Sequence, residues 1–172
     1  DAVVVAKDEH PRASTTLEAL TKLKPVVKAD GTVTAGNASG INDGAAAILI
    51  ASDAAVEKYG LKPRAKVIGA TTVGVEPRIM GFGPAPAIKK LLAQTGLTLE
   101  QMDVIELNEA FAAQSLAVIN TLGLDPAKVN PMGGAIALGH PLGATGAIRA
   151  ATVVHALRRH NLKYGMVTMC VG

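Results

Sequence analysis

Apolar residues fall into short uninterrupted runs, separated by stretches in which polar and apolar positions mix. Runs rich in Ile and Val are typical of strands that are buried on both faces. On this pattern we predict strands over residues 44–51, 65–75, 103–107 and 164–170. Helix-capping residues such as Ser52, Gly60, Gly96 and Gly123 mark the intervening stretches, which predict helices over residues 52–59, 84–93, 109–122 and 147–160.

Strands that alternate with helices predict an α/β fold built in layers, with helices covering both faces of the sheet. The first 30 residues differ, because they are polar and are interrupted by Pro11 and Pro25. They predict only a short helix that ends at Leu23. With no internal repeat and no linker, we expect a connecting segment over residues 1–30 and one domain over residues 31–172.

Composition and charge exclude several classes of function. Only 2% of the residues are aromatic and the formal net charge is +3, which argues against nucleic-acid binding but allows a basic pocket for a small anion. The single cysteine, Cys170, excludes an intramolecular disulfide framework. With no membrane-spanning apolar run and no secretory leader, we expect a cytoplasmic protein. The spacing of His155 and His160 places them on different helix faces, so we expect no metal site, and His155 is expected to pack against its neighbours.

Three reactive or polar side chains follow an apolar run or lie in a glycine loop: Asn108, His140 and Cys170. Ligands of α/β sheets collect at the carboxyl ends of strands, so these residues form a candidate site. Two of them have a plainer alternative: Asn108 caps a helix that starts at Glu109, and Cys170 is a small buried hydrophobic residue. Glu106 and Glu109 bracket Asn108 and form a candidate carboxylate pair.

His140 is the most informative of the three. Pro141 suits the first position of a helix, which places His140 at or just before a helix N-terminus. The positive end of the helix dipole disfavours an imidazolium there, and a neutral imidazole can accept a proton from a thiol. The alternative is a capping or packed histidine in a tight turn.

The glycine-rich segments do not predict a phosphate loop. Residues 139–146 lack the Lys-Ser/Thr pair of a P-loop, and residues 81–86 lack the last glycine of the dinucleotide fingerprint. Residues 36–40 instead predict a loop that a ligand approaches closely, where Ser39 offers a hydroxyl to an amide-rich ligand.

Four strings together resemble the thiolase family. They are GTVTAGNASGINDGAAA at residues 31–47, NEAFAAQ at 108–114, NPMGGAIALGHPLGATG at 130–146 and MCVG at 169–172. They fall in the family's order and spacing and cover nearly the whole chain. The match lies in the C-terminal part of a thiolase, from near the end of its loop region to just after the Cys-x-Gly segment.

The resemblance implies a five-layered αβαβα fold made of two similar halves, of which this chain is the second. It implies coenzyme A as co-substrate, a CoA thioester as substrate and no prosthetic group. It also implies a homodimer or homotetramer as the full-length enzyme, whose N-terminal half carries the nucleophilic cysteine. Without that half, residues 1–172 are expected to be inactive alone.

The resemblance also implies roles for individual residues. His140 would activate the nucleophilic cysteine, and Cys170 would exchange a proton with C2 of acetyl-CoA. Asn108 would hold a water that, with His140, stabilises the enolate oxygen of the thioester. The amide of Gly172 would contribute to a second oxyanion hole. Two further residues, Ser39 and Phe111, would line the pantetheine channel.

Within the family, residues 8–12 and 77–84 look most like the 3-oxoadipyl-CoA thiolases of aromatic-compound breakdown, whereas Met132 stands where related sequences often carry a polar residue. One alternative is a biosynthetic acetyl-CoA acetyltransferase, and general 3-ketoacyl-CoA thiolases of fatty acid metabolism share much of the pattern. Another is a thiolase-like protein that binds acyl-CoA or lipids without catalysis, which would be expected to lose the reactive residues. A ketoacyl synthase would need a second strand-end histidine.

Overall fold

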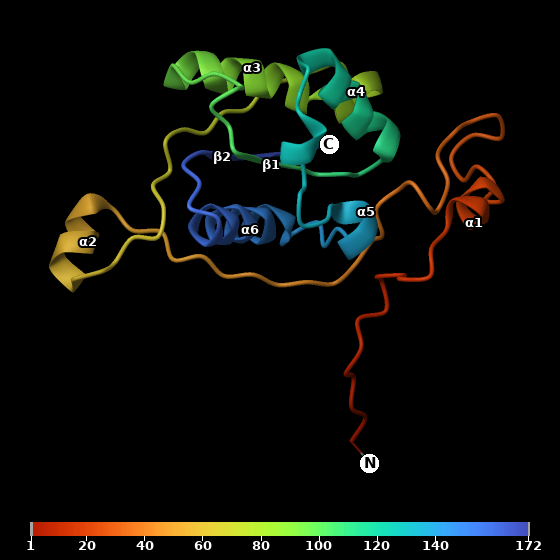
Figure 1. Ribbon diagram of the computed structural model, residues 1–172, viewed down its shortest axis with the longest axis horizontal. Coiled ribbons are helices and arrows are strands. Elements are labelled where there is room, and N and C mark those ends of the chain that lie inside the picture. Colours follow the sequence, from red (N-terminus) through yellow and green to blue (C-terminus); the bar gives the residue numbers. More distant parts are fainter. Residues whose placement is uncertain (1, 172) are drawn as a thin grey trace.

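Two short parallel strands lie at the centre of the structure, with helices on both sides of them (Figure 1). The computed structural model describes residues 2–171. Strand β1 covers Val104–Leu107 and strand β2 covers Gly165–Thr168. The α-helices are α1 (Leu17–Thr21), α2 (Asp53–Tyr59), α3 (Pro84–Thr95), α4 (Ala112–Leu122), α5 (Ala135–Leu138) and α6 (Thr145–Arg159), and the 3₁₀ helices are η1 (Pro77–Phe82) and η2 (Pro126–Lys128).

The register of the two strands brings their carboxyl ends to the same edge of the sheet. Val104 lies opposite Gly165, and Leu107 lies opposite Thr168. The pairing continues one residue beyond β1, because the backbone N–H of Asn108 donates to the carbonyl of Thr168 at 3.0 Å. The chain segments that follow β1 and β2 therefore leave the sheet side by side.

The other edge of β1 is closed by residues 129–130. Val129 forms a parallel bridge with Ile105, and the backbone N–H of Asn130 donates to the Ile105 carbonyl at 2.9 Å. The Asn130 side chain then completes the pairing: its Oδ1 accepts the N–H of Leu107 at 2.9 Å, and its Nδ2 donates to the Leu107 carbonyl at 2.8 Å. Strand β1 is thus hydrogen-bonded along both edges.

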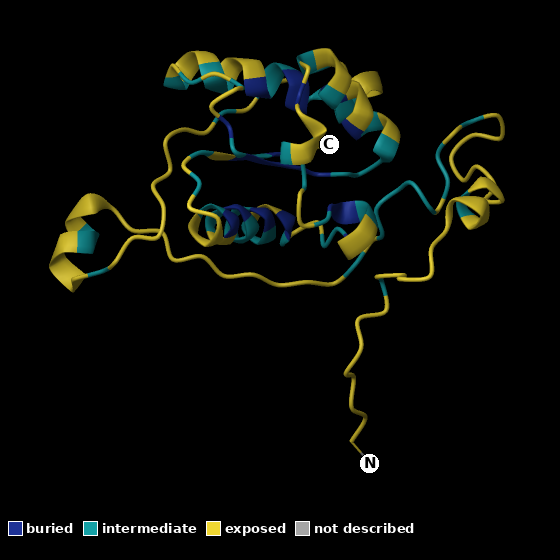
Figure 2. Ribbon diagram, in the orientation of Figure 1, coloured by how far each residue is buried: buried dark blue, intermediate teal, exposed yellow. Residues whose placement is uncertain are grey.

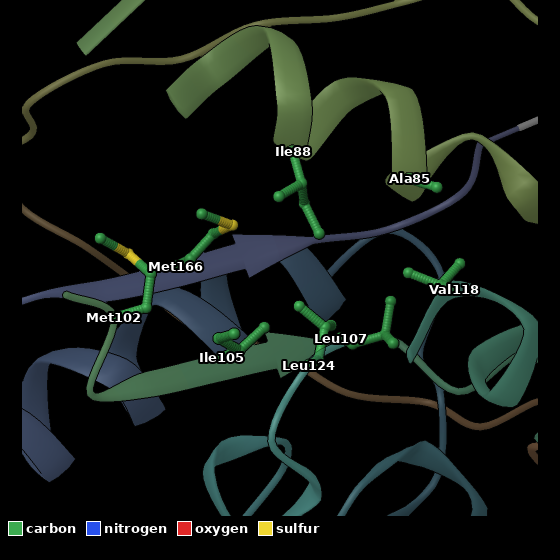
Figure 3. Close-up of a cluster of buried hydrophobic side chains, with 8 residues drawn as sticks. All are labelled: Ala85, Ile88, Met102, Ile105, Leu107, Val118, Leu124 and Met166. Atoms are coloured by element: carbon green, nitrogen blue, oxygen red, sulfur yellow. The ribbon is translucent and has the colours of Figure 1, made fainter. Parts of the chain in front are cut away.

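Helices cover both faces of the sheet, as the sequence predicts. Helices α3 and α4 lie over one face, and α6 lies over the other, where Val153 and Ala156 pack with Val104 (Figures 1 and 2). Burial of this kind contributes about 25 cal/mol for each Å² of apolar surface removed from water. The larger buried cluster, on the α3 and α4 face, consists of Ala85, Ile88, Met102, Ile105, Leu107, Val118, Leu124 and Met166 (Figure 3).

Two of the predicted strands are wrong. Residues 44–51 and 65–75 are extended, but within residues 2–171 they pair with no strand. Their apolar side chains face solvent, with Leu49 82% and Val67 77% exposed (Figure 2). An apolar run indicates a tendency to be buried, whereas a strand also needs a neighbour that accepts and donates its backbone hydrogen bonds.

The predicted helices are present, with shifted ends. Helix α2 lies between Ser52, whose side chain accepts the N–H of Ala55, and Gly60 with φ of 58°. Helix α3 continues to Thr95, α1 ends at Thr21, and α6 starts two residues earlier than predicted and ends one residue earlier. None of the helices in residues 2–171 is long and apolar enough to cross a lipid bilayer.

Two predictions on helical residues are wrong. Helix α4 starts at Ala112 rather than at Glu109, because the backbone groups just before it pair with residues 37–39. His155 is exposed rather than packed. The positions of α6 that do face the interior are Thr145, Arg149, Val153 and Ala156.

We expect residues 1–172, when produced alone, to self-associate in solution. Unpaired extended segments with exposed apolar side chains recruit other chains. Replacing Leu49 and Val67 with Lys should reduce the self-association, which sedimentation velocity measures. The matched control is Leu17→Lys, at a similarly exposed apolar position in α1. A monomeric parent chain, or an equal effect of the control, would contradict the expectation.

Candidate active site

Asn108 and Cys170 lie at the carboxyl edge of the sheet, on the segments that follow the two strands. Asn108 comes directly after β1, and Cys170 comes two residues after the end of β2. The hydrogen bond between the Asn108 N–H and the Thr168 carbonyl keeps these segments together. The structure therefore places these two residues on neighbouring segments at one edge of the sheet, where ligands of α/β sheets collect.

His140 joins Asn108 from a loop between α5 and α6. Its Nε2 lies 3.3 Å from Nδ2 of Asn108. The loop is anchored by Asn42, whose Oδ1 accepts the backbone N–H of His140 at 3.1 Å. The residue before His140 must be glycine, because Gly139 has φ of 97° and a Cβ there would lie 2.5 Å from Oδ1 of Asn42.

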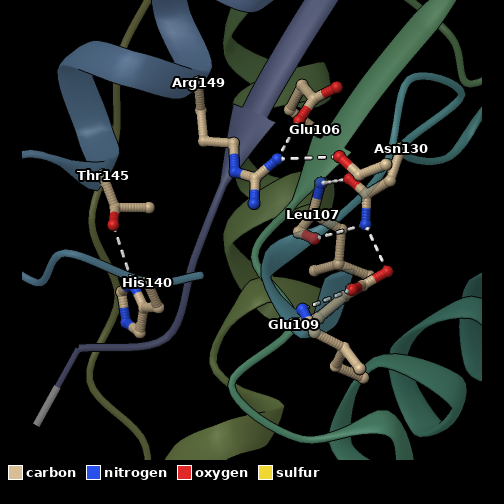
Figure 4. A network of polar contacts seen from close by, with 9 residues as sticks. Glu106, Leu107, Glu109, Asn130, His140, Thr145 and Arg149 are labelled. Atoms are coloured by element: carbon tan, nitrogen blue, oxygen red, sulfur yellow. Dashed lines mark hydrogen bonds and ion pairs between the residues drawn. The ribbon is translucent and has the colours of Figure 1, made fainter. Parts of the chain in front are cut away.

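The hydrogen bonds of His140 determine which of its nitrogens carries the proton. Nδ1 lies 2.7 Å from Oγ1 of Thr145, and that hydroxyl donates its hydrogen to the Pro141 carbonyl at 2.9 Å. A hydroxyl has one hydrogen, so with that hydrogen on the Pro141 carbonyl we assign Nδ1 as the donor to Thr145 (Figure 4). The lone pair of a neutral His140 is therefore on Nε2, where it accepts from the amide of Asn108.

The prediction that His140 lies at or just before a helix N-terminus is wrong, because α6 starts five residues later. The carbonyl of Pro141 accepts the N–H groups of Ala144 and Thr145, so a turn follows His140 and α6 begins only at Thr145. The imidazole is kept neutral in another way. Burial lowers the pKa of His140, and the positive charge of Arg149 lowers that pKa further.

Asn108 does not cap a helix, since α4 begins at Ala112 with Phe111 at its N-cap position. The Asn108 side chain is fully buried, and its Oδ1 has no hydrogen-bond partner among residues 2–171. A buried acceptor without a partner costs about 1–3 kcal/mol. Oδ1 is therefore an acceptor that a ligand or a water can use.

Cys170 is half-buried, and burial raises the pKa of its thiol. Cys170 is therefore a protonated thiol at neutral pH, which suits proton donation better than nucleophilic attack. Gly172, the expected oxyanion-hole residue, lies outside the described residues.

Ser39 and Phe111 are brought together by backbone pairing. Ala38 and Phe111 form an antiparallel bridge, and the N–H of Ser39 donates to the Ala110 carbonyl at 3.0 Å. This pairing lays the glycine loop of residues 36–40 against the start of α4. Both residues are partly exposed. A separate open hollow of about 480 Å³ lies beside the His140 loop, between residues 41–46 and 141–147.

The predicted carboxylate pair is wrong. Glu106 binds Nη1 of Arg149 at 2.8 Å, whereas Glu109 accepts from Nδ2 of Asn130 at 2.9 Å and from the backbone N–H of Ile136 at 3.1 Å (Figure 4). Burial raises the pKa of the Glu106 carboxyl, and Arg149 opposes that rise.

Sequence reasoning missed Arg149. The available signal was a charged residue inside an apolar strand, because a buried Glu106 requires a partner. The spacing of Arg149 four residues after Thr145 and four before Val153 also places it on the buried side of α6.

The arrangement supplies a neutral imidazole base, a buried amide and a protonated thiol at one edge of a sheet. These groups can take a proton from a thiol and give one to a carbon or oxygen atom of a ligand. The described residues contain no group of three or more His, Cys, Asp or Glu side chains placed to hold a metal ion.

Family models and curated relatives agree on one family. The model of the thiolase C-terminal domain matches residues 61–172, and that of the thiolase N-terminal domain matches residues 1–54. A beta-ketoadipyl-CoA thiolase of Acinetobacter baylyi is 69% identical over 100% of this chain and 43% of its own length. The 3-oxoadipyl-CoA/3-oxo-5,6-dehydrosuberyl-CoA thiolase of Escherichia coli is 55% identical over 98% of this chain and 42% of its own length. The chain thus spans less than half the length of these relatives.

Solved structures give the same result. The Bacillus anthracis acetyl-CoA acetyltransferase superposes with a TM-score of 0.94 at 50% identity, over 99% of this chain and 43% of that one. The human mitochondrial 3-ketoacyl-CoA thiolase in complex with CoA superposes with a TM-score of 0.89 at 49% identity, over 96% of this chain and 42% of that one. By sequence and by fold, this chain belongs to the thiolase family.

Proposed function

We propose that a full-length thiolase containing this chain transfers acyl groups between coenzyme A and 3-oxoacyl-CoA thioesters. The observation that carries the proposal is the line of hydrogen bonds from Thr145 through His140 to Asn108, because it leaves the His140 lone pair on Nε2 at the carboxyl edge of the sheet. A base in this position is what an acyl-transfer reaction through a thiolate requires.

In thiolysis, His140 takes the proton of a nucleophilic cysteine that lies elsewhere in the full-length enzyme. The thiolate attacks the 3-oxo carbon, the C2–C3 bond breaks, and the electron pair remains on C2 as the enolate of acetyl-CoA. Cys170 gives its thiol proton to C2. The thiol of coenzyme A then attacks the acyl-enzyme and gives its proton to the Cys170 thiolate, while the protonated His140 returns its proton to the nucleophilic cysteine as the acyl group leaves it. Condensation is the reverse sequence.

The buried side chain of Asn108 stabilises the enolate. Its Nδ2 contacts His140, and its Oδ1 is available to a water. A water held between Asn108 and His140 would donate a hydrogen bond to the enolate oxygen, and the amide of Gly172 would donate to the oxyanion of the acyl-enzyme. A preorganised donor of this kind typically lowers the barrier by about 2.7–4 kcal/mol.

Coenzyme A enters as a co-substrate rather than as a prosthetic group. We assign Ser39 and Phe111 to the channel that holds its pantetheine arm, since backbone pairing sets both residues beside the glycine loop of residues 36–40. The human relative that superposes on this chain is a complex with CoA, which supports a coenzyme A site in this fold. We further propose a homodimer or homotetramer acting in the cytoplasm.

For the substrate we propose 3-oxoadipyl-CoA, in the breakdown of aromatic compounds. Support comes from relatives named beta-ketoadipyl-CoA thiolase, at 69% identity in Acinetobacter baylyi and 61% in Pseudomonas knackmussii. The second candidate is a biosynthetic acetyl-CoA acetyltransferase, favoured by the superposition on the Bacillus anthracis enzyme of that name. The presence of Asn108, His140 and Cys170 argues against a protein that only binds acyl-CoA.

Replacing His140 with Ala in the full-length enzyme should lower kcat by about 10²–10⁴-fold, because the general base is lost. Steady-state thiolysis of 3-oxoacyl-CoA measures the effect. The matched control is His155→Ala, which removes an exposed histidine from α6 and should leave turnover unchanged. Near-normal turnover of the His140 variant would disprove the role of base.

Replacing Cys170 with Ala should block exchange of deuterium from solvent into C2 of acetyl-CoA, while acyl-enzyme formation remains partly intact. Mass spectrometry of acetyl-CoA and of the acylated enzyme separates the two steps. Exchange at the normal rate would reduce Cys170 to a packing residue.

Residues 1–172 alone should show no thiolysis, because one thiol cannot hold the acyl group and also move the C2 proton.

Among substrates, 3-oxoadipyl-CoA should be cleaved with a higher kcat/KM than acetoacetyl-CoA or a long-chain 3-oxoacyl-CoA. Parallel thiolysis assays on the three thioesters measure the preference. A preference for acetoacetyl-CoA would favour the acetyltransferase, and a preference for the long chain would favour a thiolase of fatty acid breakdown.

A further inference from the structure

A buried ion pair lies between β1 and α6, and the mechanism above does not use it. Nη1 of Arg149 donates to Oε2 of Glu106 at 2.8 Å, and it also contacts the Gly133 carbonyl at 3.2 Å (Figure 4). Glu106 is 0% and Arg149 4% exposed. The pair therefore joins the strand, the helix and the loop before α5 in the interior.

The partners of the ion pair share their elements with the groups of the site. Glu106 is two residues before Asn108 on the extended chain of β1, and residues two apart point to the same face of a strand. Arg149 is four residues after Thr145 on α6, and residues four apart lie on the same face of a helix. The ion pair thus lies on the same faces of β1 and α6 as Asn108 and Thr145, the two side chains that contact the His140 ring.

Stability alone does not account for this pair. Oε1 of Glu106 and Nε of Arg149 are buried and have no hydrogen-bond partner among residues 2–171. Apolar residues of similar volume often replace a buried ion pair without loss of stability. Two buried polar atoms of the pair thus lack a hydrogen bond within the described residues, which makes the pair weak evidence for stability.

We propose that Arg149, held in place by Glu106, is a positioning residue of the reaction, because the ion pair joins the strand and the helix whose Asn108 and Thr145 hold the His140 ring and sets a fixed positive charge next to that site. This inference rests on the proposed role of His140 as a base. Arg149 acts through His140 and does not touch the substrate. Glu106 fixes the guanidinium and limits its effect by supplying the opposite charge.

The charges around His140 support this assignment. Arg149 is the one charged group that lowers the pKa of His140, beside the effect of burial. Cys170 is neutral, because burial raises the pKa of its thiol. The titratable groups on the elements packed round the histidine are Arg149 on α6, Glu106 and Glu109 at the end of β1, Cys170 beyond β2, Asp43 beside Asn42, and His10, which contacts the Ile136 carbonyl.

The test compares variants of the two partners in the full-length thiolase through the pH dependence of kcat/KM. Arg149→Met removes the positive charge, so the pKa of His140 should rise and the acid limb of the profile should move to higher pH. Glu106→Gln leaves the guanidinium unopposed, so the pKa of His140 should fall and the acid limb should move to lower pH. A residue with only a structural role would not give shifts of opposite sign.

Three further variants keep the test interpretable. Arg149→Lys retains the charge and should keep the acid limb near that of the parent. The double variant Glu106→Leu with Arg149→Met serves if the single variants fold poorly, because it removes both charges and fills their place with apolar side chains. Its acid limb should also move to higher pH. Arg158→Met, at an exposed site of the same helix, should leave the profile unchanged.

At acidic pH we expect the Arg149→Met variant to lose about three- to tenfold in kcat/KM relative to the parent, with little loss at alkaline pH. An NMR titration of the His140 ring in the same full-length variants reads its protonation directly, whether or not the protein is active. Acid limbs and ring titrations that stay in place, or that move in one direction for both single variants, would overturn the inference. Absence of thiolysis together with the expected ring titrations would overturn the proposed function and leave the electrostatic role of Arg149 standing.

Discussion

The parallel pairing of β1 with β2 is the constraint on which the rest of the structure depends. Leu107 lies opposite Thr168, and this register sends Asn108 and the segment that leads to Cys170 out of the sheet at one edge. The same two strands provide both apolar faces on which α3, α4 and α6 pack. A shift of one residue in this register would turn the side chains of one strand to the opposite face and separate the site.

His140 is positioned by small and polar residues around a loop rather than by a helix or a strand. The histidine is neither in a helix nor in a strand, yet its backbone N–H is bound by Asn42 and its Nδ1 by Thr145. Gly139 permits the backbone conformation that brings Asn42 close. The protein thereby selects one tautomer of the imidazole through neighbouring hydrogen bonds, without a carboxylate partner.

Local sequence patterns predicted the parts of the fold that depend on local interactions. Helix α2 was readable because Ser52 and Gly60 act within a few residues of it, and β1 and β2 were readable as apolar runs. The start of α4 was not, because a distant segment, residues 37–39, occupies the backbone before Ala112. The sequence pointed to Asn108, His140 and Cys170 by their places after apolar runs or in a glycine loop. Arg149 was missed, since the partner of a buried Glu106 is defined by the packing of α6 on β1. The environment of His140 was misjudged for the same reason, because the turn after Pro141 is not encoded by the proline alone.

Asn130 has a consequence for how the sheet can grow. Its side-chain amide occupies the N–H and C=O of Leu107 as a peptide group of a neighbouring strand would, while its own backbone, with φ of 48°, turns away. A side chain thus takes the place of a main-chain partner at Leu107, and the backbone pairing on this edge of β1 ends there. The N–H and C=O of Leu107 are therefore unavailable to a neighbouring strand, whereas the second edge of β2 pairs with no strand in residues 2–171.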